Sequence, residues 1–316
     1  MRVLVTGANG FVGRHLVSRL LADGGAVNNR AVSQMTLMDV NFREPALDSR
    51  VRQIKGSIAE AGLFESAYED GGFDLVFHLA SIPGGLAEKQ YELGRDVNLH
   101  ATERLLELMR QQEGVPRLVF ASTIAVYGAP MPSEVTDDTP MRPGLSYAAQ
   151  KLIGEVLVED YSRRGWLDGV SIRLPGIVAR PPEPSGLLSA FMSDVFWRLK
   201  ANEPFVCPVS PEAVAWWMSV GCCVDNLLHA ATVPAEALVA RRSMALPVLR
   251  LSMAELIEGL ARRFGPDRLD KVEYRPDEKL EAMFGAFPIQ RAGAATALGF
   301  RHDGSVDQLI ERAMLG

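Results

Sequence analysis

The first thirteen residues place the strongest constraint on the fold of this chain. A short apolar run at 2–5 predicts a buried strand, and it continues directly into a glycine-rich segment, Thr6-Gly7-Ala8-Asn9-Gly10-Phe11-Val12-Gly13, which a helical pattern follows. A strand, a glycine-rich turn and a helix N-terminus form the pyrophosphate cradle of dinucleotide-binding folds, because glycines let the backbone approach phosphate and unpaired helix amides attract negative charge. The spacing is Gly-x-x-Gly-x-x-Gly, which differs from the Gly-x-Gly-x-x-Gly fingerprint. Its position between a strand and a helix supports the interpretation.

Short apolar runs alternate with longer amphipathic stretches in the first half of the chain, as in a parallel sheet covered by helices on both faces. We predict strands near 2–6, 35–39, 51–54, 74–79, 117–121 and 170–174, and helices near 11–22, 58–70, 90–112 and 146–163. The expected architecture is α/β, a doubly wound parallel sheet of the Rossmann type over residues 1–175, with 216–232 returning to it. A proline-rich loop follows Pro175, and we assign 176–215 and 233–290 to a smaller C-terminal substrate lobe.

Asp39 ends the second apolar run, where an acidic side chain accepts hydrogen bonds from the adenosine ribose hydroxyls and repels a 2′-phosphate. No basic residue follows it directly or lies in the glycine-rich segment. We therefore predict NAD rather than NADP as the cofactor. The alternative is that Asp39 caps a turn.

Tyr147 and Lys151 are four residues apart, which places both side chains on one face of the predicted helix. A phenol has a pKa of about 10, and a neighbouring ammonium lowers such a pKa by roughly 1–3 units. Tyr147, supported by Lys151, is then suited to remove the proton of an alcohol. The same spacing occurs by chance on many helices, so this interpretation depends on the cofactor motif.

Composition favours an enzyme that acts on small molecules. A net charge of −6 without a concentrated Lys/Arg run argues against nucleic acid or a membrane surface as a partner. The chain opens directly into a predicted core strand, and no apolar run is long enough to span a bilayer, so we expect a cytoplasmic location. The three cysteines lack metal-ligand spacing, which predicts buried apolar residues and no metal site.

These motifs together resemble the extended short-chain dehydrogenase/reductase family, in the branch of nucleotide-sugar epimerases and dehydratases. The resemblance covers nearly the whole sequence and is carried by the segments 6–13, 39, 56–58, 78–81, 97–98, 122–123, 147–151 and 173–176. It implies a catalytic set of Tyr147, Lys151 and Ser122, in which Ser122 hydrogen-bonds the reacting oxygen and Lys151 also holds the nicotinamide ribose. In that family the helices at 90–112 and 146–163 build a dimer, so we expect a homodimer.

The resemblance also implies a set of cofactor-binding residues, in which Ser57 and Ile58 flank the adenine and Leu79 and Ala80 line the cofactor. The full set is Gly7, Asn9, Gly10, Phe11, Val12, Gly13, Asp39, Ser57, Ile58, Leu79, Ala80, Asn98, Tyr147, Lys151 and Pro175. His78 receives no catalytic role, because a histidine that ends a buried strand is more simply explained by local hydrogen bonds.

The prediction of the substrate starts from a difference between this chain and the nucleotide-sugar enzymes of the family. Nucleotide-sugar enzymes of the family usually carry an arginine for the nucleotide phosphate before a valine-aspartate pair, and the stretch 216–226 has none. Trp216, Trp217 and Met218 stand there instead, either as pocket lining or as core. A narrower resemblance to sugar-acid dehydrogenases, at 81–85, 173–180 and 216–219, implies that NAD oxidises the C2 hydroxyl of D-erythronate to 2-dehydro-D-erythronate.

The substrate-binding residues that we predict combine hydroxyls with one cation. Arg180 is the candidate carboxylate anchor, because a guanidinium grips both oxygens, and a surface arginine is the alternative. The others are Ser81, Ser122, Thr123, Tyr147 and Ser185. Two other classes of protein remain open: a nucleotide-sugar epimerase or dehydratase that regenerates its NAD within one turnover, and a non-catalytic NAD sensor.

Overall fold

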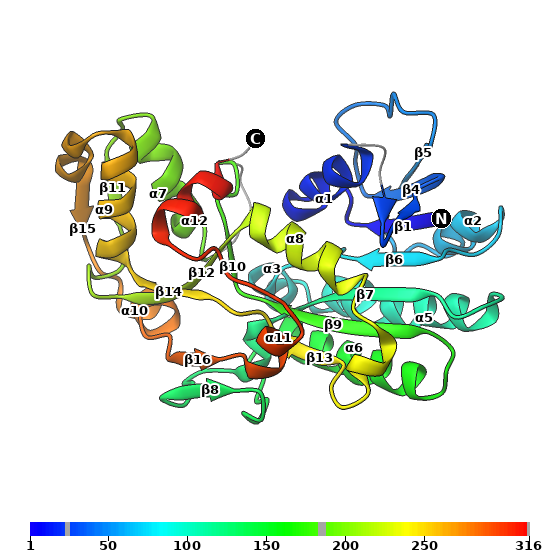
Figure 1. Cartoon of the computed structure of the whole chain (residues 1–316). Coiled ribbons are helices and arrows are strands. Elements are labelled where there is room, and N and C mark those ends of the chain that lie inside the picture. Colours follow the sequence, from blue (N-terminus) through cyan, green and yellow to red (C-terminus); the bar gives the residue numbers. More distant parts are fainter. Residues whose placement is uncertain (23–25, 183–187, 315–316) are drawn as a thin grey trace. The chain divides into compact units, whose positions relative to one another are not determined.

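The computed structural model describes residues 1–22, 26–182 and 188–314 (Figure 1). The chain forms two compact units, and we call them the first and the second unit. The first unit contains Met1–Val126, Arg142–Arg173 and Val224–Met244, and the second contains Tyr127–Met141, Leu174–Cys223 and Ala245–Gly316. These bounds differ from the predicted ones, because 127–141 groups with the second unit and the returning segment begins at Val224 rather than at 216.

The first unit is built on a seven-stranded sheet of order β13-β9-β7-β6-β1-β4-β5. Its strands are β1 (Arg2–Thr6), β4 (Gln34–Asp39), β5 (Val51–Lys55), β6 (Leu75–His78), β7 (Arg117–Thr123), β9 (Asp168–Leu174) and β13 (Ser243–Ala245). The six predicted strands are confirmed, and β13 was not predicted. From β1 the chain moves outward to β4 and β5 and then returns to β6 on the other side of β1. Parallel sheets bind ligands at such a switch point, beyond the carboxyl ends of the strands.

Helices cover both faces of this sheet. In Figure 1, α5 and α6 run side by side along one face, and α1 lies on the other. The hydrophobic core of the first unit consists of residues that are almost fully buried, among them Leu4, Phe64, Leu105 and Phe120. The helices are α1 (Phe11–Leu21), α2 (Leu63–Tyr68), α3 (Gly84–Lys89), α4 (Tyr91–Arg95), α5 (Ala101–Gln111) and α6 (Ser146–Arg163), with α8 (Val220–Ala230) crossing the boundary of the units.

The predicted helix at 90–112 is interrupted by a π-turn, η2 (Asp96–His100), between α4 and α5. The Thr102 hydroxyl donates to the Asn98 carbonyl at 2.9 Å, which gives that carbonyl a side-chain partner within the widened turn. π-turns inside α-helices often occur at functional sites. This one places the Asn98 side chain, which is 1% exposed, inside the first unit.

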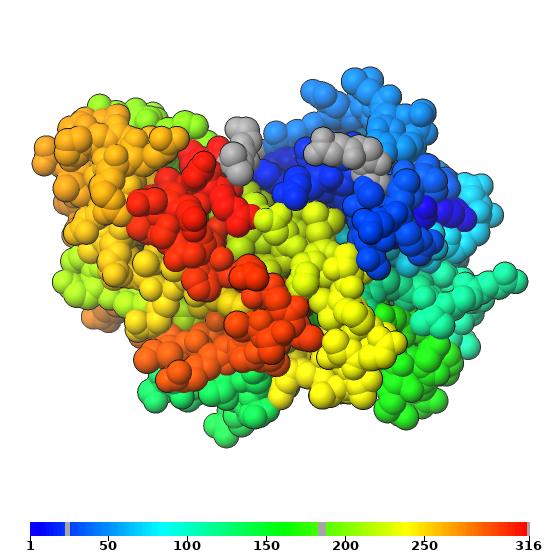
Figure 2. Space-filling view, in the orientation of Figure 1, coloured from blue at the N-terminus to red at the C-terminus, as the bar shows by residue number. Residues whose placement is uncertain are grey.

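The second unit contains short strands that pair over long distances in the sequence. One sheet has the order β10-β12-β14, and two pairs join β11 with β15 and β16 with β8. The strands are β8 (Glu134–Thr136), β10 (Gly176–Val178), β11 (Phe205–Cys207), β12 (Val214–Ser219), β14 (Leu249–Ser252), β15 (Val272–Tyr274) and β16 (Ile289–Arg291). Its helices are α7 (Phe191–Lys200), α9 (Met253–Phe264), α10 (Glu278–Phe284), α11 (Gly293–Ala297) and α12 (Val306–Ala313). Figure 2 shows α9 and α12 side by side on its surface.

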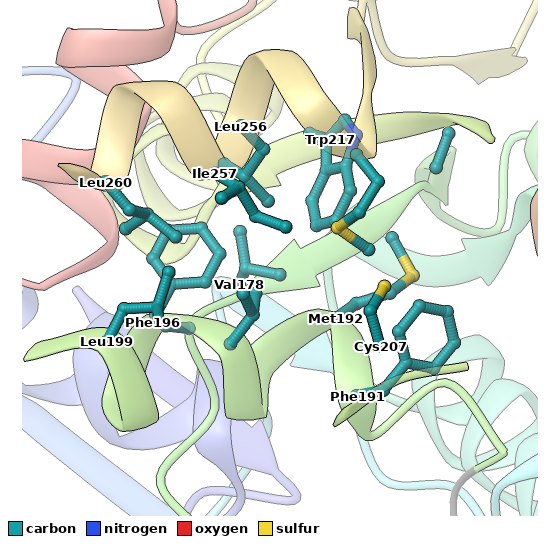
Figure 3. Packing of buried hydrophobic residues seen from close by; sticks show 14 of the residues in the cluster. Val178, Phe191, Met192, Phe196, Leu199, Cys207, Trp217, Leu256, Ile257 and Leu260 are labelled. Atoms are coloured by element: carbon teal, nitrogen blue, oxygen red, sulfur yellow. The ribbon is translucent and has the colours of Figure 1, made fainter. Parts of the chain in front are cut away.

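The core of the second unit is apolar. Figure 3 shows Val178, Phe196, Trp217 and Leu260 packed between α7, α9 and the small sheet. The start of α9 is fixed by a capping box, in which Ser252 and Glu255 exchange side-chain and backbone hydrogen bonds. Apolar packing and a capped helix start both stabilise the fold of the second unit.

Trp216, Trp217 and Met218 lie in β12 and are at most 1% exposed. The Trp216 indole donates to the Pro288 carbonyl at 2.8 Å. These residues therefore belong to the core of the second unit, which decides between the two interpretations of this stretch. The cysteines Cys207, Cys222 and Cys223 are buried, as predicted. None of the helices in the described ranges is both long and apolar enough to cross a membrane.

Candidate active site

The glycine-rich turn after β1 lies against the turn after β6. Gly7 has a φ of +71°, and a Cβ at this position would lie 2.7 Å from the Ala80 backbone nitrogen. A Cβ on Gly13 would lie 2.1 Å from the Gly7 carbonyl oxygen. Both positions therefore require glycine: a side chain at Gly7 would push the two turns apart, and one at Gly13 would push α1 away from the glycine-rich turn. Gly7 and Ala80, both predicted to contact the cofactor, are thus neighbours.

The start of α1 and the end of β4 fit a dinucleotide. Gly10 caps α1 without a side-chain hydrogen bond, and the first turn, with Phe11 and Val12, contains no acidic residue, so its field remains available for a pyrophosphate. The Asn9 amide donates to Asp39 Oδ2 at 2.8 Å, which fixes the carboxylate beside the glycine-rich turn. Asp39 thereby has a structural partner as well as the oxygens that a ribose would contact.

The other residues predicted to bind the cofactor differ in the contacts that they already make within the protein. Ser57 accepts the Ala59 amide at 3.3 Å, and Ile58 is 4% exposed within the hydrophobic core. Leu79 directly follows β6, and Pro175 connects β9 with β10. Their contacts with the cofactor stay predictions.

Asn98 connects the turn after β6 with α6. Its Oδ1 accepts the Ile82 amide at 2.8 Å, and its Nδ2 donates to the Ile82 carbonyl at 3.1 Å and to Gln150 Oε1 at 2.9 Å. Two of these hydrogen bonds fix the backbone of Ile82, next to Ser81, and the third holds the Asn98 side chain against α6. The side chain predicted to bind cofactor therefore has a structural role, because it sets where the Ser81 hydroxyl lies.

Tyr147 occupies the first turn of α6 and is half-buried. Burial raises the pKa of its phenol, and hydrogen bonds with the Thr123 and Ser81 hydroxyls oppose this shift without cancelling it. The lowering by Lys151 that the sequence predicts is therefore not seen in the protein without cofactor. Three hydroxyls from β7, α6 and the turn after β6 therefore meet at one place in the first unit. A donor that stabilises the phenolate makes Tyr147 a better base.

Lys151 lies one helical turn beyond Tyr147 and is 1% exposed. Its Nζ is 4.7 Å from the centroid of the Phe120 ring, a cation–π distance. Burial lowers the pKa of Lys151 to about 7, and the charge of Glu155 opposes this shift. Helix α6 approaches the ring this closely because of Gly154, where a Cβ would lie 2.7 Å from Phe120 Cζ.

Ser122 is buried, and its hydroxyl donates to Glu155 Oε1. Glu155 in turn pairs with Arg173, whose Nη2 is 2.7 Å from Oε2 and whose Nε is 3.0 Å from Oε1. The side chains of Glu155 and Arg173 are 3% and 4% exposed. The structure thus gives the Ser122 hydroxyl a different partner from the predicted reacting oxygen, and brings its neighbour Thr123 to Tyr147.

Glu155 was not predicted from the sequence, although a signal for it exists. Residues 147, 151 and 155 repeat at intervals of four, which places a phenol, an ammonium and a carboxylate along one face of α6. Arg173 was part of a family motif without an assigned role.

His78 is held locally, as predicted. Its Nδ1 is 2.7 Å from the Thr6 hydroxyl and its Nε2 is 3.0 Å from the Thr102 hydroxyl. Burial, together with the charge of Lys151, lowers the pKa of His78 to about 3. The ring is therefore neutral at physiological pH and serves as a hydrogen-bonded part of the core.

Arg180 belongs to the second unit, where its backbone is fixed. Its amide donates to Ser193 Oγ at 3.0 Å, and its carbonyl accepts the Trp197 indole at 2.7 Å. Ser185, the other predicted substrate residue beyond 176, lies outside the described residues.

Comparison with known proteins identifies the family. The model of the NAD dependent epimerase/dehydratase family matches residues 3–238. The chain belongs to this family. The protein is accordingly an NAD-dependent oxidoreductase of the short-chain dehydrogenase/reductase type.

Two curated relatives match over almost their full lengths. The D-erythronate dehydrogenase of Cupriavidus necator is 38% identical, with 99% of this chain and 98% of that protein covered. The D-erythronate dehydrogenase of Haemophilus influenzae is 32% identical, again covering 99% and 98%. Both are dehydrogenases in name, which distinguishes them from the isomerases and lyases of the family.

Solved structures confirm the fold. A nucleoside-diphosphate-sugar epimerase from Agrobacterium tumefaciens superposes with a TM-score of 0.90 at 34% identity, covering 98% of this chain and 92% of that one. The GalE-like L-threonine dehydrogenase from Cupriavidus necator gives a TM-score of 0.84 at 21% identity and 98% coverage of both chains, a similarity of fold.

Proposed function

We propose that the protein oxidises the C2 hydroxyl of a small sugar acid, D-erythronate, to 2-dehydro-D-erythronate with NAD. The observation that carries the proposal is the meeting of the Tyr147, Thr123 and Ser81 hydroxyls beside the buried Lys151. This arrangement suits removal of a proton from an alcohol. The full-length similarity to two D-erythronate dehydrogenases supports the choice of substrate.

In the proposed mechanism, the Tyr147 phenolate accepts the hydroxyl proton of the substrate. Thr123 and Ser81 orient the reacting oxygen, because their hydroxyls already hydrogen-bond with Tyr147. The Lys151 ammonium favours the phenolate electrostatically in this dry environment. The chemistry that NAD supplies when bound is acceptance of the hydride that leaves C2.

The role of Ser122 in this mechanism changes from the one predicted. Adjacent residues of a strand point to opposite faces, and in β7 the Thr123 side chain reaches Tyr147 while the Ser122 side chain reaches Glu155. We therefore assign the reacting oxygen to Thr123 and place Ser122 in the support of the site.

Arg180 remains our proposed anchor for the substrate carboxylate, since a charge-assisted contact of this kind is strong and specific. The Arg180→Ala variant is expected to raise the KM for sugar acids about tenfold or more without changing NAD affinity. Steady-state kinetics with D-erythronate and separate NAD titrations would measure both. An unchanged KM would return Arg180 to a structural role in the second unit.

The function is tested directly by mixing the purified protein with NAD and following NADH absorbance. Four- and five-carbon sugar acids and L-threonine form the panel, because L-threonine 3-dehydrogenase from Bos taurus also matches 98% of this chain, at 24% identity. The proposal predicts one NADH per D-erythronate oxidised, with the fastest rate in the panel. No NADH with any sugar acid, from protein that binds NAD, would reject it.

A second candidate is epimerisation of a nucleotide sugar, which the Agrobacterium tumefaciens structure favours at 34% identity. An epimerase regenerates NAD within each turnover, so it converts its substrate without releasing NADH. Chromatography of a UDP-sugar after incubation with the protein would detect such a reaction. We rank it second because residues 216–226, where the family usually carries a phosphate-binding arginine, contain none.

We also propose a homodimer formed through α5 and α6. Ile153 and Val156 on α6 are 44% and 61% exposed, an unusual placement for apolar side chains on a long helix. Sedimentation equilibrium would give the mass in solution.

A further inference from the structure

Glu155 is a buried carboxylate that the proposed mechanism does not use. It is 2% exposed and lies one helical turn beyond Lys151 on α6. Arg173 and Ser122 hold both of its oxygens through four hydrogen bonds. Hydrogen bonds from a guanidinium and a hydroxyl compensate the burial of this polar group.

Glu155 and Lys151 are one helical turn apart on α6, and both side chains are buried. Residues four apart on a helix are neighbours, and the Glu155 charge counteracts the effect of burial on the pKa of Lys151. Burial makes the site unfavourable for a cation, because Lys151 is 1% exposed and the cation–π contact with Phe120 replaces only part of the lost hydration. With the Glu155 charge present, burial already lowers the pKa of Lys151 to about 7, so without that charge the ammonium would lose its proton below neutrality.

Three other groups that ionise or carry charge lie near this part of α6: His78 on β6, Arg173 on β9 and Tyr147 on α6 itself. They contribute unequally. His78 is neutral at physiological pH, and the Tyr147 phenol is neutral until it acts as a base. Arg173 adds a positive charge that its bidentate pairing with Glu155 offsets. Of the groups named in this subsection, Glu155 is the one whose negative charge favours the ammonium form of Lys151.

We propose that Glu155 is a positioning residue for the reaction, oriented by Arg173 and Ser122 so that its carboxylate keeps the buried Lys151 in the ammonium form beside Tyr147. This inference rests on the proposed role of Lys151 as the cation that supports the Tyr147 phenolate. It also gives Ser122 a defined task, because the Ser122 hydroxyl fixes the Glu155 oxygen that it contacts.

The test variant is Glu155→Gln, which removes the charge and retains an oxygen that can accept from Ser122. Lysine labelled with ¹³C at Cε reports each ammonium titration by NMR, and the Lys151 signal is assigned by its loss in Lys151→Arg. The titration midpoint of Lys151 is expected to move to lower pH by about 1 unit in the protein without cofactor. The high-pH limb of the kcat/KM profile for D-erythronate is expected to move in the same direction.

Glu159→Gln is the matched control, because Glu159 lies one turn further along α6 and is exposed. This variant removes the same charge from the same helix and is expected to leave the Lys151 midpoint unchanged. If Glu155→Gln does not fold, Glu155→Gln combined with Arg173→Gln removes both members of the pair. In this double variant the Lys151 titration midpoint is expected to move to lower pH by less than in Glu155→Gln alone. The reason is that the positive charge of Arg173, which disfavours the Lys151 ammonium, is removed together with the negative charge of Glu155.

An unmoved Lys151 midpoint in whichever of these variants folds would overturn the inference. The titration needs neither substrate nor NAD, so its outcome is separate from the proposed function. NADH release from D-erythronate together with an unmoved midpoint rejects the role of Glu155 alone. A shifted midpoint in a protein that does not oxidise sugar acids rejects the proposed substrate and leaves the positioning role in place.

Discussion

The two units bury different kinds of side chain. Beneath Tyr147, the first unit encloses Lys151, Glu155 and Arg173, each at most 3% exposed as a residue. The core of the second unit consists of apolar residues from α7, α9 and β12, including the fully buried Leu260. One interior is hydrogen-bonded and charged, and the other is packed like an ordinary hydrophobic core.

The difference shows where function is located. Burying a charge pair rarely adds stability, and breaking one by removing a single partner costs about 3–5 kcal/mol. We infer that the buried cluster formed by Lys151 and Glu155 of α6 and Arg173 of β9 serves the proposed chemistry rather than stability. The apolar core has the opposite property, because its loss changes the free energy of unfolding and leaves the chemistry intact.

The sharpest test of the charged interior is Tyr147→Phe. Removing the phenolic oxygen removes the base, so kcat is expected to fall by about a thousandfold. The apolar ring is retained, and NAD affinity should change little. Stopped-flow or long-incubation NADH assays would measure the rate, with NAD binding followed by fluorescence. Turnover near the wild-type rate would rule out Tyr147 as the base.

Leu260→Ala tests the hydrophobic core of the second unit. Truncating a fully buried leucine leaves a cavity, so the free energy of unfolding should fall by about 2–5 kcal/mol, while kcat at a temperature below unfolding stays within about twofold. Urea denaturation followed by tryptophan fluorescence gives the first quantity. Leu269→Ala is the control, since Leu269 is 47% exposed and its loss should cost less than about 0.5 kcal/mol. Equal losses in the two variants would contradict the assignment of the core.

Thr123→Ala and Ser122→Ala separate two neighbours on β7. Loss of the Thr123 hydroxyl is expected to lower kcat about 10- to 100-fold, because it contacts Tyr147. Loss of the Ser122 hydroxyl should have a smaller effect on kcat, since it acts through Glu155. Parallel kcat measurements give the ranking, and the reverse order would restore Ser122 to the reacting oxygen.

The smallest expected effect concerns cofactor choice. Asp39→Asn keeps an oxygen that can accept the Asn9 amide and removes the charge that repels a 2′-phosphate. The ratio of KM for NADP to KM for NAD should fall about tenfold, which corresponds to about 1.4 kcal/mol. Kinetics with each cofactor at saturating substrate measure this ratio. A ratio equal to that of the wild type would mean that Asp39 acts only as a structural partner of Asn9.

Much of the first unit is predictable because its strands and helices follow local periodicity. Asp39 and the pair at 147 and 151 could be placed from such patterns, since each follows or begins an element that is visible in the sequence. The partner of Ser122 could not, because alternation along β7 shows that 122 and 123 face opposite sides without showing which side holds the site. That choice depends on where α6 packs.

The short strands of the second unit were not predicted for a related reason. Strands of three residues such as β10 and β11 have too few positions to show a period of two, and their partners, β12 and β15, are distant in the sequence. The placement of 216–218 in the core followed from those pairings. Its residue types alone were equally compatible with a pocket.

The π-turn at Asp96–His100 also changes how the helical pair α4 and α5 can be altered by insertion or deletion. Each residue of an α-helix turns the chain by about 100°, so one additional residue in a turn rotates everything after it by that angle. The buried stripe of α5, with Leu105 and Met109, depends on this rotation relative to α4. The wider π-turn holds its additional residue within a single turn, so deleting one residue between 96 and 100 would restore a regular helix and keep that stripe against the core. The same deletion inside α5 would rotate the residues after it by about 100°, so the π-turn is the part of this helical stretch most tolerant of a change in length.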